Sequence, residues 1–424
     1  MSLLKKIFTL GANETYNRGI AFYNQGAYEG AIQEFEKITR GRFGGARLYP
    51  QLALFYTGQA HRNLGLVAMY EGRYDEAVGR FEKALSMTPK NLELHTYLGV
   101  CYNNRGLHEN AVREFTYVVE ETPEELQGYL RLATANCNGA HYEAALARVC
   151  QALEMEPHYA DFHYLLGVIL CREKDYPPAI RAFSEAVRLN PKYLEAYLKQ
   201  AYAQAASGAF AEALETLRRG RSFSPEDPSL QQPLSLLEQN SPEAHAAFLR
   251  QAEEAFSQAS IIEPHLATPL TIPQKPQKDV GFYNTLVQIY QDALRDHPHY
   301  ADFHYGLGHA YHQLGRREEA LPWYQKALGI NPHYLQAQIA LGYCYKEMGD
   351  CEAAKQIFEK VAAKEASHPE VFYQLALLLG EEASYARAIQ LIEKALGLEE
   401  DLEGARETLG LFRKKMKHAQ APSP

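Results

Sequence analysis

The sequence predicts a solenoid, which is a fold built by stacking copies of one short unit. The first observation is a fixed step of 34 residues between small residues, at Gly65, Gly99, Ala133, Gly167 and Ala201. The same step separates prolines, at Pro89, Pro123, Pro157, Pro191 and Pro225. It also separates alanines and large apolar residues, at Ala77, Ala111, Ala145, Ala179 and Ala213 and at Phe81, Phe115, Val149, Phe183 and Leu217. A fixed period of this length is typical of repeat architectures.

One stretch shows most of the repeated unit: residues 97–123 read YLGVCYNNRGLHENAVREFTYVVEETP. This stretch resembles the tetratricopeptide repeat, and the matching residues are Leu98, Gly99, Tyr102, Ala111, Phe115 and Pro123. The resemblance implies two antiparallel helices per repeat. We therefore expect an all-α fold, a right-handed α-solenoid of about nine recognisable 34-residue helix-turn-helix repeats.

Local sequence signals agree with helix pairs. Gly72, Gly106 and Gly208 lie where a left-handed turn residue would end the first helix of a repeat. Each periodic proline then ends the second helix, because proline cannot continue it. The small residues are expected where the two helices touch, since they let the backbones approach closely.

The first array of repeats is predicted over residues 12–227, with about six repeats. An amphipathic segment, residues 1–11, precedes it and either docks on the exposed end of the first repeat or touches a membrane surface. Gly19 and Gly65 are too far apart for the period, so twelve extra residues are expected near 46–57, as a Gly-rich loop and a helix lengthened through Tyr70.

An insertion is predicted over residues 228–300, where the period is lost. It contains a helical stretch over 242–262, a Pro-rich linker over 263–280 and a single helix near 281–296. The period returns over 301–402 as a second array of three repeats, and residues 403–424 are predicted as a capping helix and tail. The octapeptide PHYADFHY occurs at 157–164 and at 298–305, which indicates duplicated repeats.

Composition excludes several classes of protein. No apolar run approaches the ~20 residues that cross a bilayer, and the start of the chain does not resemble a signal peptide, so we expect a cytoplasmic protein. The formal charge of −9 argues against nucleic acid as the main partner. Six single cysteines show no zinc or redox spacing and are expected to be small buried or half-buried residues.

The family resemblance implies a binding scaffold, in which the first helices line a concave groove for peptides or helices of partner proteins. Positions two, five, nine and twelve of a first helix share one face, and asparagines beside them can bond a peptide backbone. Either packing between repeats or ligand binding would explain the tyrosines among them. The candidate peptide-binding residues are Tyr16, Tyr23, Asn24, Arg62, Asn103, Asn104, Tyr164, Tyr202, Tyr305, His309, His312, Tyr343 and Tyr373.

Other ligand classes are less favoured. A repeat subtype that grips chaperone C-termini needs a basic residue and an Asn at positions that here hold Tyr16 and Ile20. Gly41, Gly44 and Gly45 lack the rest of a phosphate-binding loop. The basic residues Arg413, Lys414, Lys415 and Lys417 are expected on a solvated capping helix.

We therefore expect a non-enzymatic adaptor or assembly scaffold with protein partners, no cofactor and no catalytic residue. One alternative is a structural protein that assembles with itself through its ends or its insertion. A weaker one is a metal site formed by Asp302, His304, His309 and His312, although no diagnostic metal-ligand spacing accompanies them.

Overall fold

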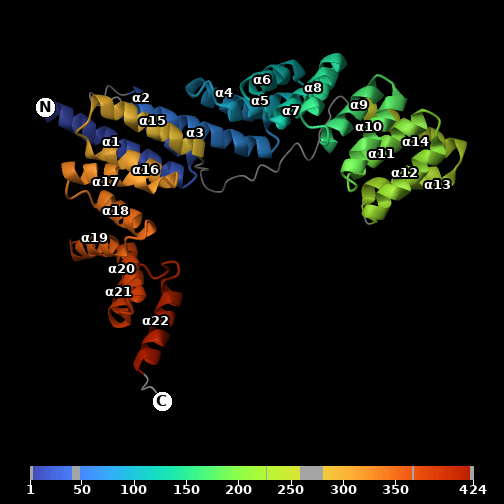
Figure 1. The fold of residues 1–424 in the computed structure, drawn as a ribbon. Coiled ribbons are helices and arrows are strands. Elements are labelled where there is room, and N and C mark those ends of the chain that lie inside the picture. The colour runs from blue at the N-terminus through green and yellow to red at the C-terminus, as the bar shows by residue number, and fades with distance from the viewer. Residues whose placement is uncertain (1–2, 41–47, 226, 258–279, 365–366, 421–424) are drawn as a thin grey trace. The chain divides into compact units, whose positions relative to one another are not determined.

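The computed structural model describes residues 3–40, 48–225, 227–257, 280–364 and 367–420, and within these ranges it describes side chains for residues 14–417. All regular elements in this part of the chain are helical (Figure 1). The first twelve are α1 (Leu3–Asn24), α2 (Tyr28–Arg40), α3 (Leu48–Tyr70), α4 (Tyr74–Met87), α5 (Leu92–Asn104), α6 (His108–Glu121), α7 (Leu126–Asn138), α8 (Tyr142–Met155), α9 (Ala160–Arg172), α10 (Tyr176–Leu189), α11 (Leu194–Ala206) and α12 (Phe210–Phe223).

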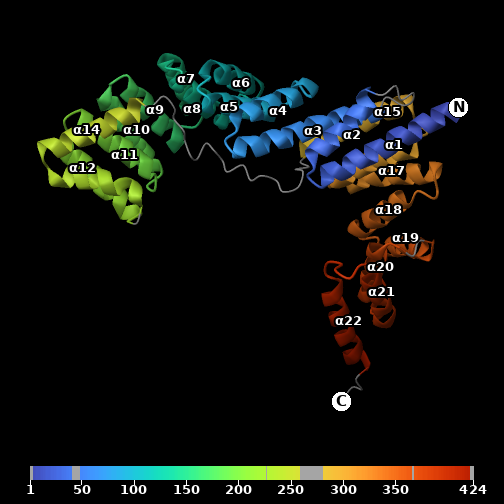
Figure 2. The ribbon, with the colours of Figure 1, turned by 180° about the vertical axis from the view of Figure 1, so that it is seen from behind.

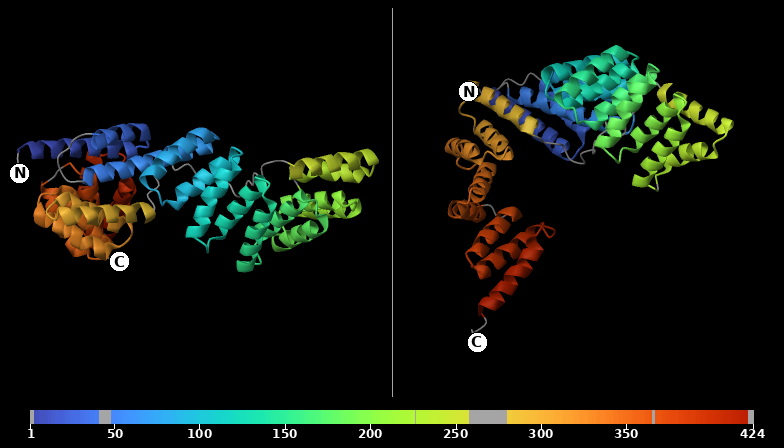
Figure 3. Two further views of the ribbon diagram at one scale, coloured as in Figure 1. Left: turned by 90° about the horizontal axis from the view of Figure 1, so that it is seen from above. Right: turned by 45° about the vertical axis from the view of Figure 1, so that its right-hand side comes forward.

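A short 3-10 turn, Pro228–Leu230, separates these helices from the rest. The following ten are α13 (Gln231–Gln239), α14 (Pro242–Ser257), α15 (Val280–Asp296), α16 (Ala301–Gln313), α17 (Arg317–Ile330), α18 (Leu335–Glu347), α19 (Cys351–Lys364), α20 (Pro369–Glu381), α21 (Tyr385–Leu398) and α22 (Ala405–Gln420). Successive helices pack in pairs, as Figures 2 and 3 show from other sides, and the predicted α-solenoid of helix-turn-helix repeats is confirmed.

The turn inside each repeat has the predicted geometry. Gly72, Gly106 and Gly208 have φ angles of 73°, 74° and 89°, in the left-handed region that glycine enters without a steric penalty. Three other repeats place a residue with a side chain at this position, namely Ala140, Lys174 and Ala383.

The periodic glycines of the first helices lie under an aromatic ring. A Cβ atom on Gly99 would lie 2.5 Å from Cε1 of Phe115, and the same relation holds for Gly65 with Phe81 and Gly167 with Phe183. These rings are buried. The glycines therefore let the two helices of one repeat close around a ring.

A second recurring contact explains part of the duplicated octapeptide. His163 Nε2 lies 2.8 Å from the Pro157 carbonyl oxygen, and His304 Nε2 lies 2.8 Å from that of Pro298. The contact joins the proline that follows a second helix to the first turn of the next repeat. It fixes the direction in which the chain enters that repeat.

The contacts divide the chain into two bodies. Body one comprises residues 1–17, 37–53 and 276–424, and body two comprises residues 18–36 and 54–275. Each has its own core of buried apolar residues. The repeat period did not indicate that residues 1–17 and 37–53 group with the C-terminal part of the chain.

Helices lie in four of the predicted segments. They are α3 after the predicted extra residues, α14 in the predicted helical stretch, α15 after the predicted linker and α22 in the last predicted segment. Segment 1–11 continues without a break into α1 from Leu3 onward, but its side chains lie outside the described residues, as do Gly41, Gly44, Gly45 and the linker up to residue 279.

The cysteines correct one expectation. Cys101, Cys137, Cys171 and Cys344 are buried, but Cys150 and Cys351 are exposed, because both lie on the outer face of a second helix. Among the residues that the structure describes, no helix is both long and apolar enough to span a membrane.

Candidate protein-binding surfaces

Helix α14 lies across the first helices α9 and α11 of two consecutive repeats in body two (Figures 1 and 2). Its residues Ala244, Phe248, Ala252 and Phe256 follow one another at intervals of four and are buried, so they form one apolar face. The ring of Tyr202 on α11 lies 4.9 Å from that of Phe248 and 6.4 Å from that of Phe256. The face built by these first helices thus holds an amphipathic helix.

Lys199 on α11 contacts the C-terminal end of the same helix. Its Nζ donates a hydrogen bond of 3.2 Å to the Ala255 carbonyl and lies 5.7 Å from the centre of the Phe256 ring. Carbonyls in the last turn have no partner inside their own helix, so a cation there satisfies an acceptor and complements the helix dipole. Burial lowers the pKa of Lys199.

Four of the predicted groove residues are buried, namely Tyr23, Arg62, Tyr164 and Tyr202. Arg62 makes a two-pronged ion pair with Glu93, at 2.5 and 2.8 Å. The hydroxyl of Tyr164 donates to Glu195 at 2.9 Å. Both contacts join the first helices of consecutive repeats, so these side chains stabilise the stack, whereas Tyr202 contacts α14.

The predicted asparagines remain closer to the surface. Asn103 is half-buried, and its Oδ1 accepts from Nδ2 of Asn138 in the next repeat at 3.2 Å. Asn104 is exposed, and its Nδ2 donates to the Val100 carbonyl of the preceding turn at 2.9 Å. Asn24 is also exposed.

In body one the predicted groove residues also make contacts within the protein. Tyr343 and Tyr373 are half-buried, and the Tyr373 hydroxyl lies 3.0 Å from that of Thr408 on α22. The two ring nitrogens of His312 lie 3.3 Å from the Tyr324 hydroxyl and 3.0 Å from Glu347. A metal bound by His312 would have to displace one of them, and no group of three potential ligands occurs among the residues that the structure describes.

Tyr16 and Tyr305 line a cavity of about 380 Å³ in body one. Asp302 and three tyrosines that sequence analysis did not select, Tyr49, Tyr290 and Tyr334, line it too. They come from α3, α15 and the turn before α18, and no periodic position connects these three stretches. Tyr334 is one period away from Tyr300, and for Tyr49 and Tyr290 the high count of 29 tyrosines was the signal that the sequence offered.

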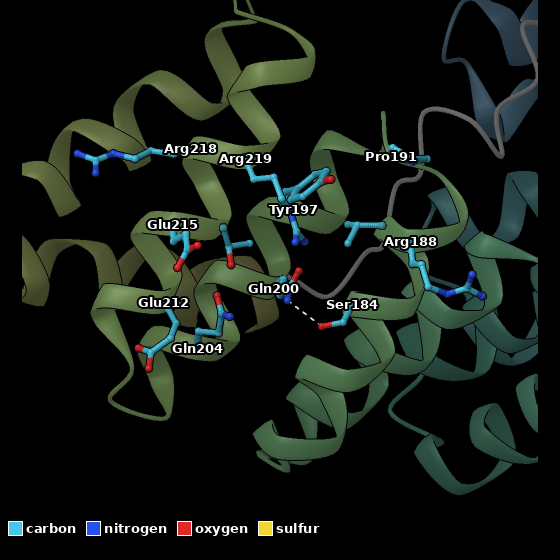
Figure 4. A pocket seen from close by; sticks show the side chains of 12 residues that line it. Ser184, Arg188, Pro191, Tyr197, Gln200, Gln204, Glu212, Glu215, Arg218 and Arg219 are labelled. Carbon is cyan, nitrogen blue, oxygen red and sulfur yellow. Dashed lines mark hydrogen bonds between the residues drawn. The ribbon is translucent and has the colours of Figure 1, made fainter.

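A second cavity, of about 950 Å³, lies between α10, α11 and α12 in body two (Figure 4). Gln200 donates from Nε2 to the Ser184 hydroxyl at 2.9 Å, while Oε1 of Gln200 and of Gln204 are buried without a hydrogen-bond partner in the described structure. Buried acceptors of this kind favour a ligand with N–H donors. Carboxylates and guanidinium groups both surround them, so the charges select no single ligand class.

Two of the basic residues on α22 contact the preceding helix. Arg413 donates to Glu393 of the preceding helix at 2.7 Å, and Lys415 lies 5.9 Å from the centre of the Tyr385 ring. These contacts hold the last helix on α21.

Comparisons with solved structures give neighbours of low identity. One, TTC0263, a thermophilic TPR protein of Thermus thermophilus, is 24% identical over 43% of this chain and 99% of that one, with a TM-score of 0.36. MamA of Desulfovibrio magneticus RS-1 is 19% identical over 41% and 97%, with a TM-score of 0.37. The structure described for pilF of Pseudomonas aeruginosa is 18% identical over 47% and 91%, with a TM-score of 0.37. Among curated proteins, no match is found.

Family models give the assignment. Models of the tetratricopeptide repeat match residues 62–125 and 130–193, 170–239, 301–334, 336–367 and 369–402. Together these ranges cover more than half of the chain, and they lie over α3–α13 and α16–α21. The chain belongs to the tetratricopeptide repeat family.

Proposed function

We propose that this protein is an adaptor that binds amphipathic helices of partner proteins on the first-helix face of its repeats, as part of the assembly of a larger complex. The observation that supports the proposal is the packing of α14 on α9 and α11. This packing provides an aromatic contact at Tyr202 and a cationic contact to the helix end at Lys199. The proposal assigns no catalytic role.

In this proposal α14 occupies the surface that a partner helix would use. A partner with large apolar residues eight positions apart, as Phe248 and Phe256 are, would make the same contacts with Tyr202. A helix held within the same chain has a high effective concentration, so a partner must compete with it.

The test uses the full chain and a labelled synthetic peptide with the sequence of residues 242–257. Replacing the buried Phe248 by Asp should release α14, because a carboxylate in an apolar contact is costly. We expect the Phe248→Asp protein to bind the peptide in fluorescence anisotropy and the unchanged protein to bind it at least about tenfold more weakly. Ala246→Asp, on the exposed side of α14, is the matched control and should behave like the unchanged protein.

A second substitution locates the binding surface. Adding Tyr202→Ala to the Phe248→Asp protein should weaken peptide binding about tenfold or more, since aromatic anchors dominate such interfaces. If the Phe248→Asp protein keeps its helical circular dichroism but does not bind the peptide, the proposed surface is wrong. Light scattering on the same samples tests the alternative of self-assembly, which predicts a mass that rises with concentration.

A further inference from the structure

The cavity in body one combines tyrosine rings with a single acidic group. Its tyrosines come from α1, α3, α15, α16 and the turn before α18. The Tyr16 and Tyr49 rings lie 5.6 Å apart, and the Tyr305 and Tyr334 rings lie 5.1 Å apart. Aromatic walls therefore stand on more than one side of the cavity.

Asp302 is the one residue with a formal charge among the described residues that line this cavity. Part of Asp302 remains accessible to solvent although other protein atoms surround its carboxyl, so a ligand can reach it. It accepts a hydrogen bond from the Tyr334 hydroxyl, while the surrounding protein raises the pKa of its carboxyl by removing water. A carboxylate in such a place gains more from a cation than one on an open surface does.

The rings favour the same kind of ligand. The face of an aromatic ring carries partial negative charge and attracts a cation within ~6 Å of its centre. Burial raises the pKa of Tyr290 and of Tyr305, so both phenols stay protonated and neutral. The Tyr290 ring also packs directly on the backbone of α16, because a Cβ atom on Gly306 would lie 2.2 Å from it.

The duplicated octapeptide shows that this environment is specific to body one. In body two the tyrosine equivalent to Tyr305 is Tyr164, which is buried and donates to Glu195. The residue equivalent to Glu195 is Gln336, which lines the cavity and carries no charge. The last tyrosine of the octapeptide is thus buried against a neighbouring helix in one array and lines a cavity in the other.

We propose that this cavity binds the cationic side chain of an arginine or lysine presented by a partner protein. The carboxylate of Asp302 would pair with the cation, and the faces of Tyr49, Tyr305 and Tyr334 would enclose its apolar stem and charged head. This inference deepens the proposed function and rests on it, because it names the chemistry of one partner residue. Its cavity lies in body one, whereas the surface for the helix lies in body two.

The experiment compares two small probes that differ in charge and hardly in shape. These are Nα-acetyl-arginine methylamide and the corresponding citrulline compound, with binding to the full chain measured by saturation-transfer NMR titration. We expect the arginine probe to bind at least about tenfold more tightly than the citrulline probe. The lysine analogue should also bind. Equal binding of arginine and citrulline, or no binding of either, overturns the proposal.

Substitutions assign the site. Asp302→Asn should weaken binding of the arginine probe about tenfold, whereas Asp161→Asn, at the equivalent place of the octapeptide in body two, should leave it unchanged. Gly306→Ala should also weaken binding, because the added methyl group displaces the Tyr290 ring. If Asp161→Asn has the same effect as Asp302→Asn, the cavity is not the site. In the Phe248→Asp protein, binding of the 242–257 peptide reports on body two and should be unaffected when Asp302→Asn is added.

Discussion

At the scale of single residues, the two helices of a repeat are matched in volume at one contact. Where the first helix carries glycine, an aromatic ring lies against it, as in Gly99 with Phe115 and Gly342 with Phe358. Where the first helix carries alanine, the partner is a smaller aliphatic residue. These pairs are Ala133 with Val149, Ala201 with Leu217 and Ala376 with Ile392, and all six residues are buried. The sum of the two volumes, and not either residue alone, is what the contact requires.

This matching predicts a strong coupling between two substitutions. Gly99→Ala should destabilise the protein by about 1–3 kcal/mol, because its Cβ would lie 2.5 Å from the Phe115 ring. Adding Phe115→Val recreates the combination of Ala133 and Val149, so the double variant should be more stable than the two separate losses predict. Urea unfolding followed by circular dichroism gives the free energies of unfolding of the two single variants and the double variant. If the two single losses simply add in the double variant, the two residues are not matched in volume.

The left-handed turn positions predict stabilising substitutions. Ala140 and Ala383 have φ angles of 60° and 58°, where a side chain is strained and glycine is not. Ala140→Gly and Ala383→Gly should each stabilise the protein by about 0.5–1 kcal/mol. Gly106→Ala is the reverse control and should destabilise it, since a Cβ there would meet no atom within 4 Å and only the backbone conformation changes. Urea unfolding shows whether each substitution raises or lowers the free energy of unfolding.

The buried residue His61 predicts that the free energy of unfolding depends on pH. It is buried, its Nδ1 has no hydrogen-bond partner in the described structure, and burial with the nearby Arg80 and Lys83 lowers its pKa to about 4. The unfolded chain binds the proton at the ordinary value near 6.5, so this contribution is complete above pH 6.5 and is lost as the pH falls towards 4. The loss should be about 3 kcal/mol. His61→Gln should flatten the unfolding free energy measured between about pH 7 and pH 4, and an unchanged slope would contradict the assignment.

At the scale of helices, α22 closes body one. Phe412 is 6% exposed and its ring lies over Gly380 of α20, while its neighbour Leu411 is 50% exposed. Phe412→Ala should therefore destabilise body one by about 3–5 kcal/mol, and Leu411→Ala should have little effect. The single tryptophan, Trp323 on α17, lies in body one, so its fluorescence during urea unfolding reports on this body. Equal shifts for the two variants would mean that α22 is not a packed cap.

The elements also show what sequence can and cannot predict. The period fixed the helix pairs and the turn at Gly106, because both depend on residues within one repeat. The period also selected Tyr202 as a groove residue. The sequence of the insertion, where the period is lost, predicted a helical stretch over residues 242–262, but neither signal placed this stretch against Tyr202. The contact of Phe248 with Tyr202 joins residues outside the periodic pattern to residues within it. The cavity around Asp302 was missed for the same reason, since Tyr49 and Tyr290 belong to non-periodic segments.

At the scale of the whole chain, stability is expected to be local. Each repeat packs on its neighbours, and the cores of bodies one and two are built from separate sets of residues. In such proteins the free energy is approximately a sum of repeat terms and neighbour terms. A substitution in one body should therefore destabilise the repeats near it more than the repeats of the other body.

Hydrogen exchange can test this locality with the Gly99→Ala protein. Gly99 lies on α5 and faces the Phe115 ring of α6, so amide protection should fall most in the repeats around residues 74–155 of body two and much less in α16–α21. The urea transition of Trp323 fluorescence should stay within about 0.3–0.5 kcal/mol of that of the unchanged protein, as for distant independent sites. Phe412→Ala is the reciprocal control, because it should lower protection in α20 and α21 and leave α5–α8 unchanged. If either variant lowered protection equally in both bodies, the chain would unfold as one cooperative unit, and α14 could not leave its seat without loosening body one.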